Sequence, residues 1–370
     1  MKEIEVTRQN IEALDKEIAA LFEKRMILAR DVAEYKKERG LSVKDQAREN
    51  ALLSKNRAYI SDSEIEEYYV ELQKTVMALS CKYQERLLSG LKVAYCGVKG
   101  AFAHIAAIKM FPNAQFFPYK SFEEAYRAVE SGDCDCCVLP LENSYAGEVD
   151  TVTDLLFTGS LYVNQVINLP IEHCLMAKEN TSPESIKTVI SHSQALKQCK
   201  GYIEEKGFET SESANTAMAA EAIKNSTDNT LAAIASYDAA ELYGLKVIER
   251  NINDSRGNST RFAAFSRVQN IPAQSKLRED ENFILVFTVQ NKAGALAQTL
   301  NILGAHGYNM RSLRSRPMKN LEWQYFFYIE AEGNINTANG KALLTELSAI
   351  CARLKLAGTY FVKTYADVNL

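Results

Sequence analysis

The chain has 370 residues, a formal net charge of −4 and a sequence pI of about 5.8. This length allows two or three domains with cores of their own, and the lack of a basic excess argues against a nucleic-acid partner. No apolar run approaches the ~20 residues of a membrane span, and the N-terminus lacks a signal-peptide pattern. We therefore expect a cytoplasmic protein. The eight scattered cysteines favour reduced thiols, and the cluster at 134–137 lacks zinc spacing, so no metal site is expected.

The first predicted element is a long helix over residues 7–39, which contain neither proline nor glycine. Its apolar residues recur at spacings of three, four and seven and trace one helical face; they are Ile11, Leu14, Ile18, Leu21, Leu28 and Val32. Arg8, Arg25 and Lys36 lie in register with this face. Because an unpaired buried cation is costly, these three favour a polyanionic ligand. The alternative is that they snorkel to solvent or pair with acidic residues of neighbouring helices.

Distances along the helix indicate how the cations are shared. At ~1.5 Å per residue, Arg25 and Lys36 lie roughly 16 Å apart, so their side chains can close on one small ligand. Arg8 lies roughly 25 Å from Arg25 and cannot easily reach that ligand. An antiparallel helix from a second subunit can supply it, so we expect a homodimer with shared sites, or a dimer of such dimers.

Two further helices are expected before residue 90. Asp45, Arg48 and Glu49 share one side of a helix start, and residues 61–64 read as a cap before a third helix that carries Ser80 and Gln84. Together with the three cations, this pattern resembles the all-helical chorismate mutase family and defines a domain over residues 1–89. The resemblance implies an interlocked dimer in which a neighbour's Arg8 completes each pocket.

The chemistry of that family fits these residue types. Chorismate rearranges to prephenate without a nucleophile, a proton transfer or a cofactor, so the enzyme needs only to fold the substrate and stabilise charge on the breaking ether bond. By resemblance, Arg8 and Arg25 hold the two carboxylates, while Asp45, Arg48 and Ser80 contribute to binding. Lys36 and Gln84 then donate to the ether oxygen, and Glu49 accepts from the ring hydroxyl.

From residue 91 the pattern changes to short apolar strands that alternate with helical segments, which is typical of an α/β fold. Strands are expected at 92–96, 136–141, 163–168, 188–191, 231–235, 246–249 and 261–265, and helices at 104–111 and 122–131. A segment of about 175 residues suits two lobes around a cleft. Polar clusters lie at the ends of several predicted strands, at 97–102, 140–147, 191–194 and 258–262, the last of which leads into a strand. Taken singly, turn and cap chemistry explains each equally well.

Taken together, these clusters resemble prephenate dehydratase, over residues 91–268. The resemblance rests chiefly on Pro140-Leu141-Glu142-Asn143-Ser144, Ser191-His192, Gln198 and Thr260-Arg261-Phe262. It implies that Thr260 donates to the departing hydroxyl of prephenate, and that Asn143, Ser191, Gln198 and Arg261 orient the substrate or hold its carboxylates. Ala103 departs from the family, which usually has serine there.

After a polar linker, the C-terminal segment reads as strand 283–289, helix 294–305, strands 309–316 and 323–331, helix 340–354 and strand 359–365, a ferredoxin-like βαββαβ order. It resembles the amino-acid-binding ACT domain, here over residues 282–370. The resemblance implies a phenylalanine site built from Gly294, Ala295, Leu296, Asn309, Ser315 and Arg316. The family reads Glu-Ser-Arg-Pro where this chain has Arg314-Ser315-Arg316-Pro317.

The sequence as a whole is identified as a member of the bifunctional chorismate mutase/prephenate dehydratases with a C-terminal ACT domain. The expected fold is multidomain: an all-α mutase domain, a two-lobed α/β dehydratase domain and an α+β ACT domain. The resemblance implies chorismate and prephenate as substrates, L-phenylalanine as allosteric ligand, and neither cofactor nor metal. Two alternatives stay open: a second step that prefers arogenate, and a non-catalytic amino-acid sensor.

Overall fold

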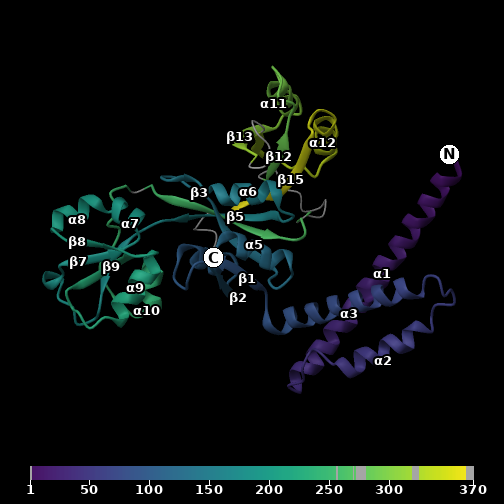
Figure 1. Cartoon of the computed structure of the whole chain (residues 1–370), viewed down its shortest axis with the longest axis horizontal. Helices are drawn as coiled ribbons and strands as arrows, with labels where there is room; N and C mark the ends of the chain where they lie inside the picture. The colour runs from purple at the N-terminus through teal and green to yellow at the C-terminus, as the bar shows by residue number, and fades with distance from the viewer. Residues whose placement is uncertain (1, 256, 270, 272–280, 319–324, 364–370) are drawn as a thin grey trace. The chain divides into compact units, whose positions relative to one another are not determined.

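The computed structural model describes residues 2–255, 257–269, 271, 281–318 and 325–363, which divide into two compact units, Met1–Leu91 and Lys92–Leu370 (Figure 1). Among the described helices, none is both long enough and apolar enough to cross a membrane.

The N-terminal unit consists of three helices, α1 (Lys2–Glu38), α2 (Gln46–Arg57) and α3 (Glu66–Ser89). The Asp45 carboxylate caps α2 by accepting a hydrogen bond from the backbone N–H of Arg48 at 3.0 Å. The expected cap at 61–64 is wrong, because α3 begins only at Glu66 and its N-cap residue, Ile65, makes no side-chain cap bond. Asp62 instead accepts from the N–H of Glu64 and shapes the preceding turn.

The apolar stripe of α1 is largely uncovered within this chain. Ile11, Leu14, Ile18 and Leu21 are each more than half exposed, whereas Ala29 and Ala33, nearer the C-terminal end, are buried. Figure 1 shows the N-terminal part of α1 extending beyond α2 and α3. A long helix whose apolar face lacks partners over several turns needs another surface to cover it.

The second unit begins with a mixed sheet that forms the core of its first lobe. Its strands are β1 (Lys92–Cys96), β2 (Gln115–Tyr119), β3 (Cys136–Asn143), β4 (Gly147–Glu148), β5 (Tyr162–Pro170) and β11 (Ser259–Ser266), and its helices are α4 (Phe102–Met110), α5 (Phe122–Glu130) and α6 (Asp150–Thr158). The strand order β5-β11-β3-β1-β2 places β3 and β11 side by side in the middle. Cys136 and Cys137 are buried in β3, as a small-residue strand predicts.

The second lobe contains a five-stranded sheet in the order β10-β6-β9-β7-β8. Its strands are β6 (Cys174–Ala177), β7 (Thr188–Ser191), β8 (Glu209–Glu212), β9 (Leu231–Ala235) and β10 (Lys246–Glu249), with helices α7 (Ser193–Gln198), α8 (Lys200–Lys206), α9 (Thr216–Asn225) and α10 (Tyr237–Tyr243) and the short 3₁₀ helix η1 (Pro183–Ser185). The chain passes between the lobes twice, and hydrogen bonds join the two passages: Ile171 N–H to Asn258 O at 2.9 Å and His173 N–H to Asn253 Oδ1 at 2.7 Å.

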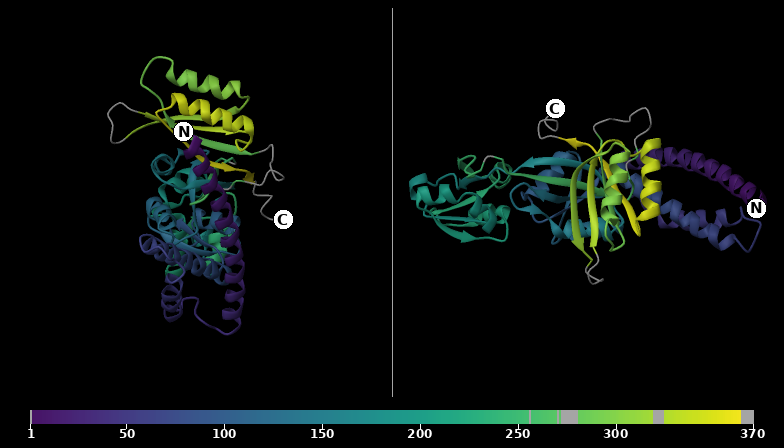
Figure 2. Two further views of the ribbon diagram at one scale, coloured as in Figure 1. Left: turned by 90° about the vertical axis from the view of Figure 1, so that its right-hand side faces the viewer. Right: turned by 90° about the horizontal axis from the view of Figure 1, so that it is seen from above.

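The C-terminal part has the predicted βαββαβ order, with β12 (Asn282–Thr288), α11 (Ala295–Ala305), β13 (Asn309–Pro317), β14 (Tyr325–Glu332), α12 (Ala338–Ile350) and β15 (Arg353–Tyr360), followed by β16 (Val362–Lys363). Helices α11 and α12 cover one face of its sheet (Figure 2). Side chains of the other face, Ile284, Val286, Phe326 and Tyr328, belong to the core of the first lobe.

The last expected elements were partly misplaced. The helix predicted to reach residue 354 ends at Ile350, and β15 starts at Arg353 rather than at 359. The sequence places Leu354 at the end of this helix and assigns no element to residues 355–358, but an antiparallel ladder with β12 makes the segment a strand. The predicted strand residues 323, 324, 364 and 365 lie outside the described part of the chain.

Gly358 is where the C-terminal sheet joins the first lobe. β15 pairs with β5 in parallel at Gly358 and Val163. A Cβ atom at position 358 would lie 2.2 Å from the carbonyl oxygen of Val163, so only glycine permits this approach. Because of this contact, one continuous sheet spans the first lobe and the C-terminal βαββαβ segment.

Candidate active sites

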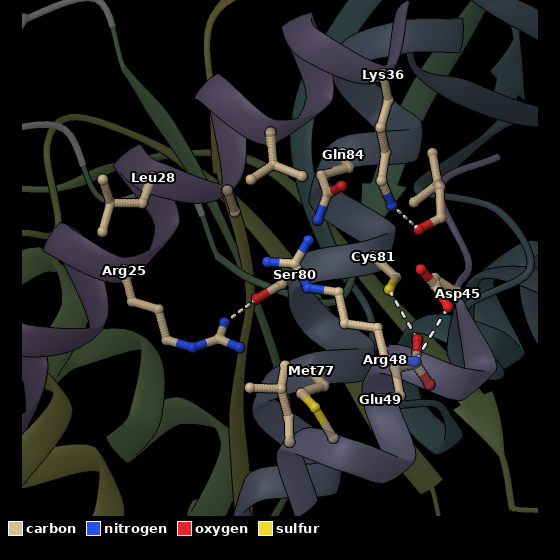
Figure 3. Close-up of a pocket in the computed structure, with 14 residues that line it drawn as sticks. Arg25, Leu28, Lys36, Asp45, Arg48, Glu49, Met77, Ser80, Cys81 and Gln84 are labelled. Atoms are coloured by element: carbon tan, nitrogen blue, oxygen red, sulfur yellow. Dashed lines mark hydrogen bonds between the residues drawn. The ribbon is translucent and has the colours of Figure 1, made fainter. Parts of the chain in front are cut away.

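The first candidate site is a cavity of about 220 Å³ between the three helices of the N-terminal unit. It is lined from α1 by Arg25, Leu28, Ala29, Val32 and Lys36, from the start of α2 by Val43, Asp45, Arg48, Glu49 and Leu52, and from α3 by Met77, Ser80, Cys81 and Gln84. Figure 3 shows the charged members pointing toward one another from their separate helices. Seven of the eight predicted mutase residues therefore line one cavity, Arg8 being the exception.

Two of the cations are held by neutral partners rather than by carboxylates. The Arg25 guanidinium donates to the Ser80 hydroxyl (Figure 3). It also donates, at 3.4 Å, to the carbonyl oxygen of Val76 on α3. Lys36 donates to the carbonyl oxygen of Val43. Neutral acceptors fix the position of a charge without cancelling it, so both cations stay available to an anionic ligand. This arrangement favours the ligand interpretation over internal ion pairing.

The remaining polar groups of the cavity lie on α2 and α3. Glu49 accepts a weak hydrogen bond from the Cys81 thiol at 3.6 Å, and burial together with this carboxylate raises the pKa of Cys81. Gln84 is buried, and its Oε1 has no hydrogen-bond partner among the described residues. A buried amide oxygen without a partner is uncommon, and the amide it belongs to lines the cavity.

Arg8 lies far from this cavity in its own chain. Its side chain is 68% exposed and forms an i,i+3 ion pair with Glu5 at 3.6 Å. The length of α1 separates Arg8 from Arg25, as the helical rise predicts. Its assignment to a pocket therefore depends on a second subunit and stays a prediction.

The second candidate site is organised by Asn143 and Thr260, which face each other across strands β3 and β11. The Asn143 amide donates to Thr260 Oγ1 at 2.9 Å and to Asn258 Oδ1 at 2.8 Å. Its carbonyl oxygen accepts from the backbone N–H groups of Tyr145 and Ala146. Because Thr260 Oγ1 accepts from Asn143, the threonine keeps its own proton free to donate elsewhere.

A small recess between the lobes adjoins this pair. It is lined by Tyr145, Lys197, Gln198, Asn253, Asp254, Ser255 and Asn258. Gln198 Oε1 lies 2.9 Å from His173 Nε2, and burial lowers the pKa of His173, which keeps the imidazole neutral at pH 7. His173 Nδ1 has no partner among the described groups. Asn258 and His173 are site residues that the sequence interpretation did not assign, although Asn258 lies within the polar cluster at 258–262.

Ser191 and Arg261 do not join the recess. Ser191 is fully buried, and its hydroxyl donates to the carbonyl oxygen of Ile234 at 2.6 Å on the neighbouring strand β9. Arg261 follows Thr260 directly, so strand geometry directs the two side chains to opposite faces of the sheet. Its guanidinium binds Glu330 of β14, and this carboxylate raises the pKa of Arg261 against the effect of burial. The structure thus places Arg261 away from Thr260, and we no longer assign it to the substrate.

The predicted regulatory residues separate into two groups. Ala295 and Leu296, next to the α11 N-cap residue Gly294, line a cavity of about 330 Å³ together with residues of β12, β14 and the start of β15. Asn309, Ser315 and Arg316 are not among its lining residues. Asn309 donates to Glu332, and Arg316 binds Asp150 and Asp154 on α6. The last two contacts give Arg316 a partner in the first lobe rather than in the cavity.

No group of three or more His, Cys, Asp or Glu side chains in the described ranges is placed to hold a metal ion. All eight cysteines lie in those ranges and are free thiols.

Comparison with known proteins agrees with this geometry. Residues 7–85 match the family model of chorismate mutase type II, residues 93–270 that of prephenate dehydratase, and residues 283–349 that of the ACT domain. The chain is 30% identical to a bifunctional chorismate mutase/prephenate dehydratase of Enterobacter agglomerans, over 95% of this chain and 94% of the relative.

Two further matches each cover about three quarters of this chain. Arogenate dehydratase/prephenate dehydratase 1 of Arabidopsis thaliana is 31% identical over 74% of this chain and 72% of that protein. The solved structure of an Arthrobacter aurescens prephenate dehydratase in complex with L-Phe matches with a TM-score of 0.67 and 25% identity, over 73% of this chain and 90% of that chain. The chain therefore belongs to the bifunctional chorismate mutase/prephenate dehydratases with a C-terminal ACT domain, which convert chorismate to prephenate and then to phenylpyruvate in phenylalanine biosynthesis.

Proposed function

We propose that the rearrangement takes place in the cavity of the N-terminal unit, and that its charge balance carries this assignment. The lining has three cationic side chains, Arg25, Lys36 and Arg48, and two carboxylates, Asp45 and Glu49. These five charged side chains sum to a formal +1. Arg8 of the partner subunit would raise this to +2, which matches the two carboxylates of chorismate. Arginine suits such carboxylates because its planar fork binds them in a bidentate manner.

The roles within the cavity follow from the contacts of each residue. Arg25, held by Ser80, binds one carboxylate, and Arg8 of the partner subunit binds the other. Lys36 and the Gln84 amide donate to the ether oxygen as its bond breaks, where fixed donors stabilise developing charge most effectively. Glu49 accepts from the ring hydroxyl, while Asp45 caps α2 and so sets the position of Arg48.

The exposed stripe of α1 supports a homodimer. A second α1 lying antiparallel would cover Ile11, Leu14, Ile18 and Leu21 and bring Arg8 to the opposite cavity. In the alternative assembly, two such dimers associate through their C-terminal domains to form a tetramer.

For the dehydratase, we propose that Thr260 donates to the departing hydroxyl of prephenate. The ring C–OH bond breaks as the ring carboxylate leaves as CO₂, and the electrons of that C–C bond complete the aromatic ring. The hydroxyl leaves more easily when a hydrogen bond stabilises its growing negative charge. Asn143 holds the oxygen of Thr260 so that the proton points outward, and Gln198 lines the adjoining recess.

The domains proposed here are residues 1–89 for the mutase, 91–268 for the dehydratase and 282–370 for the ACT domain. We assign L-phenylalanine to the ACT domain, with Gly294, Ala295 and Leu296 at the ligand, because a prephenate dehydratase relative was solved in complex with L-Phe. Calorimetry against the twenty amino acids tests this assignment of L-phenylalanine.

Arogenate stays an alternative substrate because a relative is named for both dehydratase activities. Comparing the turnover of arogenate with that of prephenate decides between the two substrates. The free thiols support a cytoplasmic location.

The mutase assignment is tested by Arg25→Ala, with Arg30→Ala on the same helix as the matched control. Loss of a fixed charge contact is expected to lower chorismate turnover about 10²- to 10³-fold, and the control should keep normal turnover. Prephenate turnover should not change in either variant, since it takes place in the other unit. Near-normal chorismate consumption by Arg25→Ala would refute the assignment.

Subunit sharing is tested by refolding Arg8→Ala and Arg25→Ala chains together. Each variant alone is expected to be inactive as a mutase. Random mixing makes half of the dimers mixed, and each mixed dimer has one intact site, so roughly a quarter of the wild-type activity should return. If mixed dimers form and no activity returns, Arg8 does not act across the interface.

A further inference from the structure

Strands β3 and β11, which carry Asn143 and Thr260, present different residues on their two faces. Thr260 pairs with Asn143 across β11 and β3, and the next pair in register is Arg261 with Glu142. Successive side chains of a strand point to opposite faces. Asn143 and Thr260 therefore share the catalytic face, while Glu142 and Arg261 share the face that the C-terminal domain covers.

A compact charge cluster occupies that covered face. Its carboxylates are Glu142, Glu148 and Glu330, and its cations are Arg261 and Arg314, all at most 30% exposed. Arg261 donates to Glu330 at 2.9 Å and to the Tyr360 hydroxyl at 3.1 Å, and it lies 3.6 Å from Glu142. Arg314 and Glu330 come from the ACT sheet, so the cluster joins the two domains.

Arg314 spans the short hairpin that carries Asn143. Its Nη2 lies 2.9 Å from Glu142 and its Nε lies 2.7 Å from Glu148. These two carboxylates are direct cross-strand neighbours in the β3–β4 hairpin, and the adjacent pair is Asn143 with Gly147. Like charges directly opposite each other destabilise a strand pair, so Arg314 neutralises a repulsion next to Asn143.

Arg311 and Arg316, which also belong to β13, bind other partners than Arg314 does. Arg311 is about half exposed and pairs at 3.4 Å with Glu332 of the ACT domain itself. Arg316 shares a face of β13 with Arg314, but it binds Asp150 and Asp154 on α6 and not the hairpin. Among these three arginines, only Arg314 contacts both strands of the hairpin that carries Asn143.

We propose that Arg314 is a positioning residue of the dehydratase: by clamping Glu142 and Glu148 it fixes the hairpin that holds Asn143, and through Asn143 it orients the Thr260 hydroxyl. This inference rests on the proposed role of Thr260. It also assigns a function to position 314, where this chain has arginine and its family has glutamate. The ACT sheet thereby contributes a residue that sets the geometry of the dehydratase site.

The test compares Arg314→Met with Arg311→Met in the full-length protein, using prephenate turnover and, as an internal control, chorismate turnover. A misplaced catalytic group costs up to about 100-fold in rate; we expect Arg314→Met to lower kcat for prephenate about 10- to 100-fold. KM should change less than threefold, because Arg314 does not reach the recess. Chorismate turnover should stay normal in both variants, and Arg311→Met should keep the wild-type kcat for prephenate.

A milder variant keeps the proposal falsifiable if Arg314→Met unfolds the dehydratase, and a double variant tests the repulsion between Glu142 and Glu148. Arg314→Lys keeps the charge but loses the fork that reaches two carboxylates, so its kcat should fall between those of wild type and Arg314→Met. Glu148→Gln removes the cross-strand repulsion, so the double variant Arg314→Met/Glu148→Gln should be no slower than Arg314→Met alone. An unchanged kcat in Arg314→Lys and Arg314→Met, an equal loss in Arg311→Met, or additive losses in the double variant would overturn the proposal.

The failure of this inference can be told apart from failure of the site assignment. If Thr260→Val keeps full prephenate turnover, the proposed site is wrong. If Thr260→Val is inactive while Arg314→Met and Arg314→Lys turn over normally, the site stands and the positioning role of Arg314 is wrong.

Discussion

The substitution Thr260→Val separates chemistry from stability at the dehydratase site. Valine keeps the shape of threonine and suits a strand, but it removes the hydroxyl. The Asn143 amide that donates to Thr260 Oγ1 also donates to Asn258 Oδ1 and to the carbonyl oxygen of Ser259 at 3.2 Å. No buried donor is therefore left without an acceptor when the hydroxyl is gone.

The magnitudes follow from these contacts. Loss of one neutral hydrogen bond costs about 1 kcal/mol, and the buried methyl group of valine offsets part of this, so the free energy of unfolding should fall by ~1 kcal/mol or less. Loss of a positioned proton donor, in contrast, should lower kcat for prephenate ~10²-fold or more. A large loss of activity with little loss of stability is the expected signature.

The assay measures prephenate turnover and urea unfolding on the same preparations, with Thr299→Val as the matched control. Thr299 is also buried, and its hydroxyl donates within helix α11 to Ala295 O. The control should show a similar change in stability and no change in kcat. If Thr260→Val turns over prephenate at more than a tenth of the wild-type rate, the hydroxyl is not the donor.

Two further predictions concern stability. Gly358→Ala should lower the free energy of unfolding by about 1–3 kcal/mol, because its Cβ would overlap the Val163 carbonyl and nearby atoms have little room to move. Gly304→Ala serves as the control, since its Cβ meets nothing within 4 Å. Equal unfolding midpoints for the two variants would contradict this packing argument. Stability should also fall as the pH drops below 6.5: burial lowers the pKa of both His104 and His173 from this ordinary value, so the unfolded chain binds more protons than the folded one in this range. Thermal unfolding at pH 7.5 and 5.5 measures this loss of stability. The loss should be smaller in a variant with both histidines replaced by glutamine. If that variant loses as much stability as the wild type, groups other than these histidines cause the pH dependence.

The sequence by itself determined the domain order, the fold class and most of the mutase cavity. Helical periodicity is local, so the register of Arg25 and Lys36 with the apolar face of α1 already indicated a shared ligand. The helical rise predicted that Arg8 is too far along the helix to join them, and in the structure its side chain is exposed and pairs with Glu5. The family motifs likewise indicated Asn143 and Thr260, which the sheet places 2.9 Å apart.

Only the tertiary structure decided which neighbours in sequence share a site. Thr260 and Arg261 belong to one motif, yet strand alternation and the docking of the ACT sheet give them different partners. Residues 353 and 354 were predicted to end a helix and residues 355–358 to lie outside any element, yet the ladder with β12 makes all of them part of a strand. The departure at Arg314 had no evident use in the sequence, because its partners Glu142 and Glu148 lie more than 160 positions earlier in the chain. Contacts between distant segments depend on how sheets stack and join, and periodicity within one segment carries no information about that.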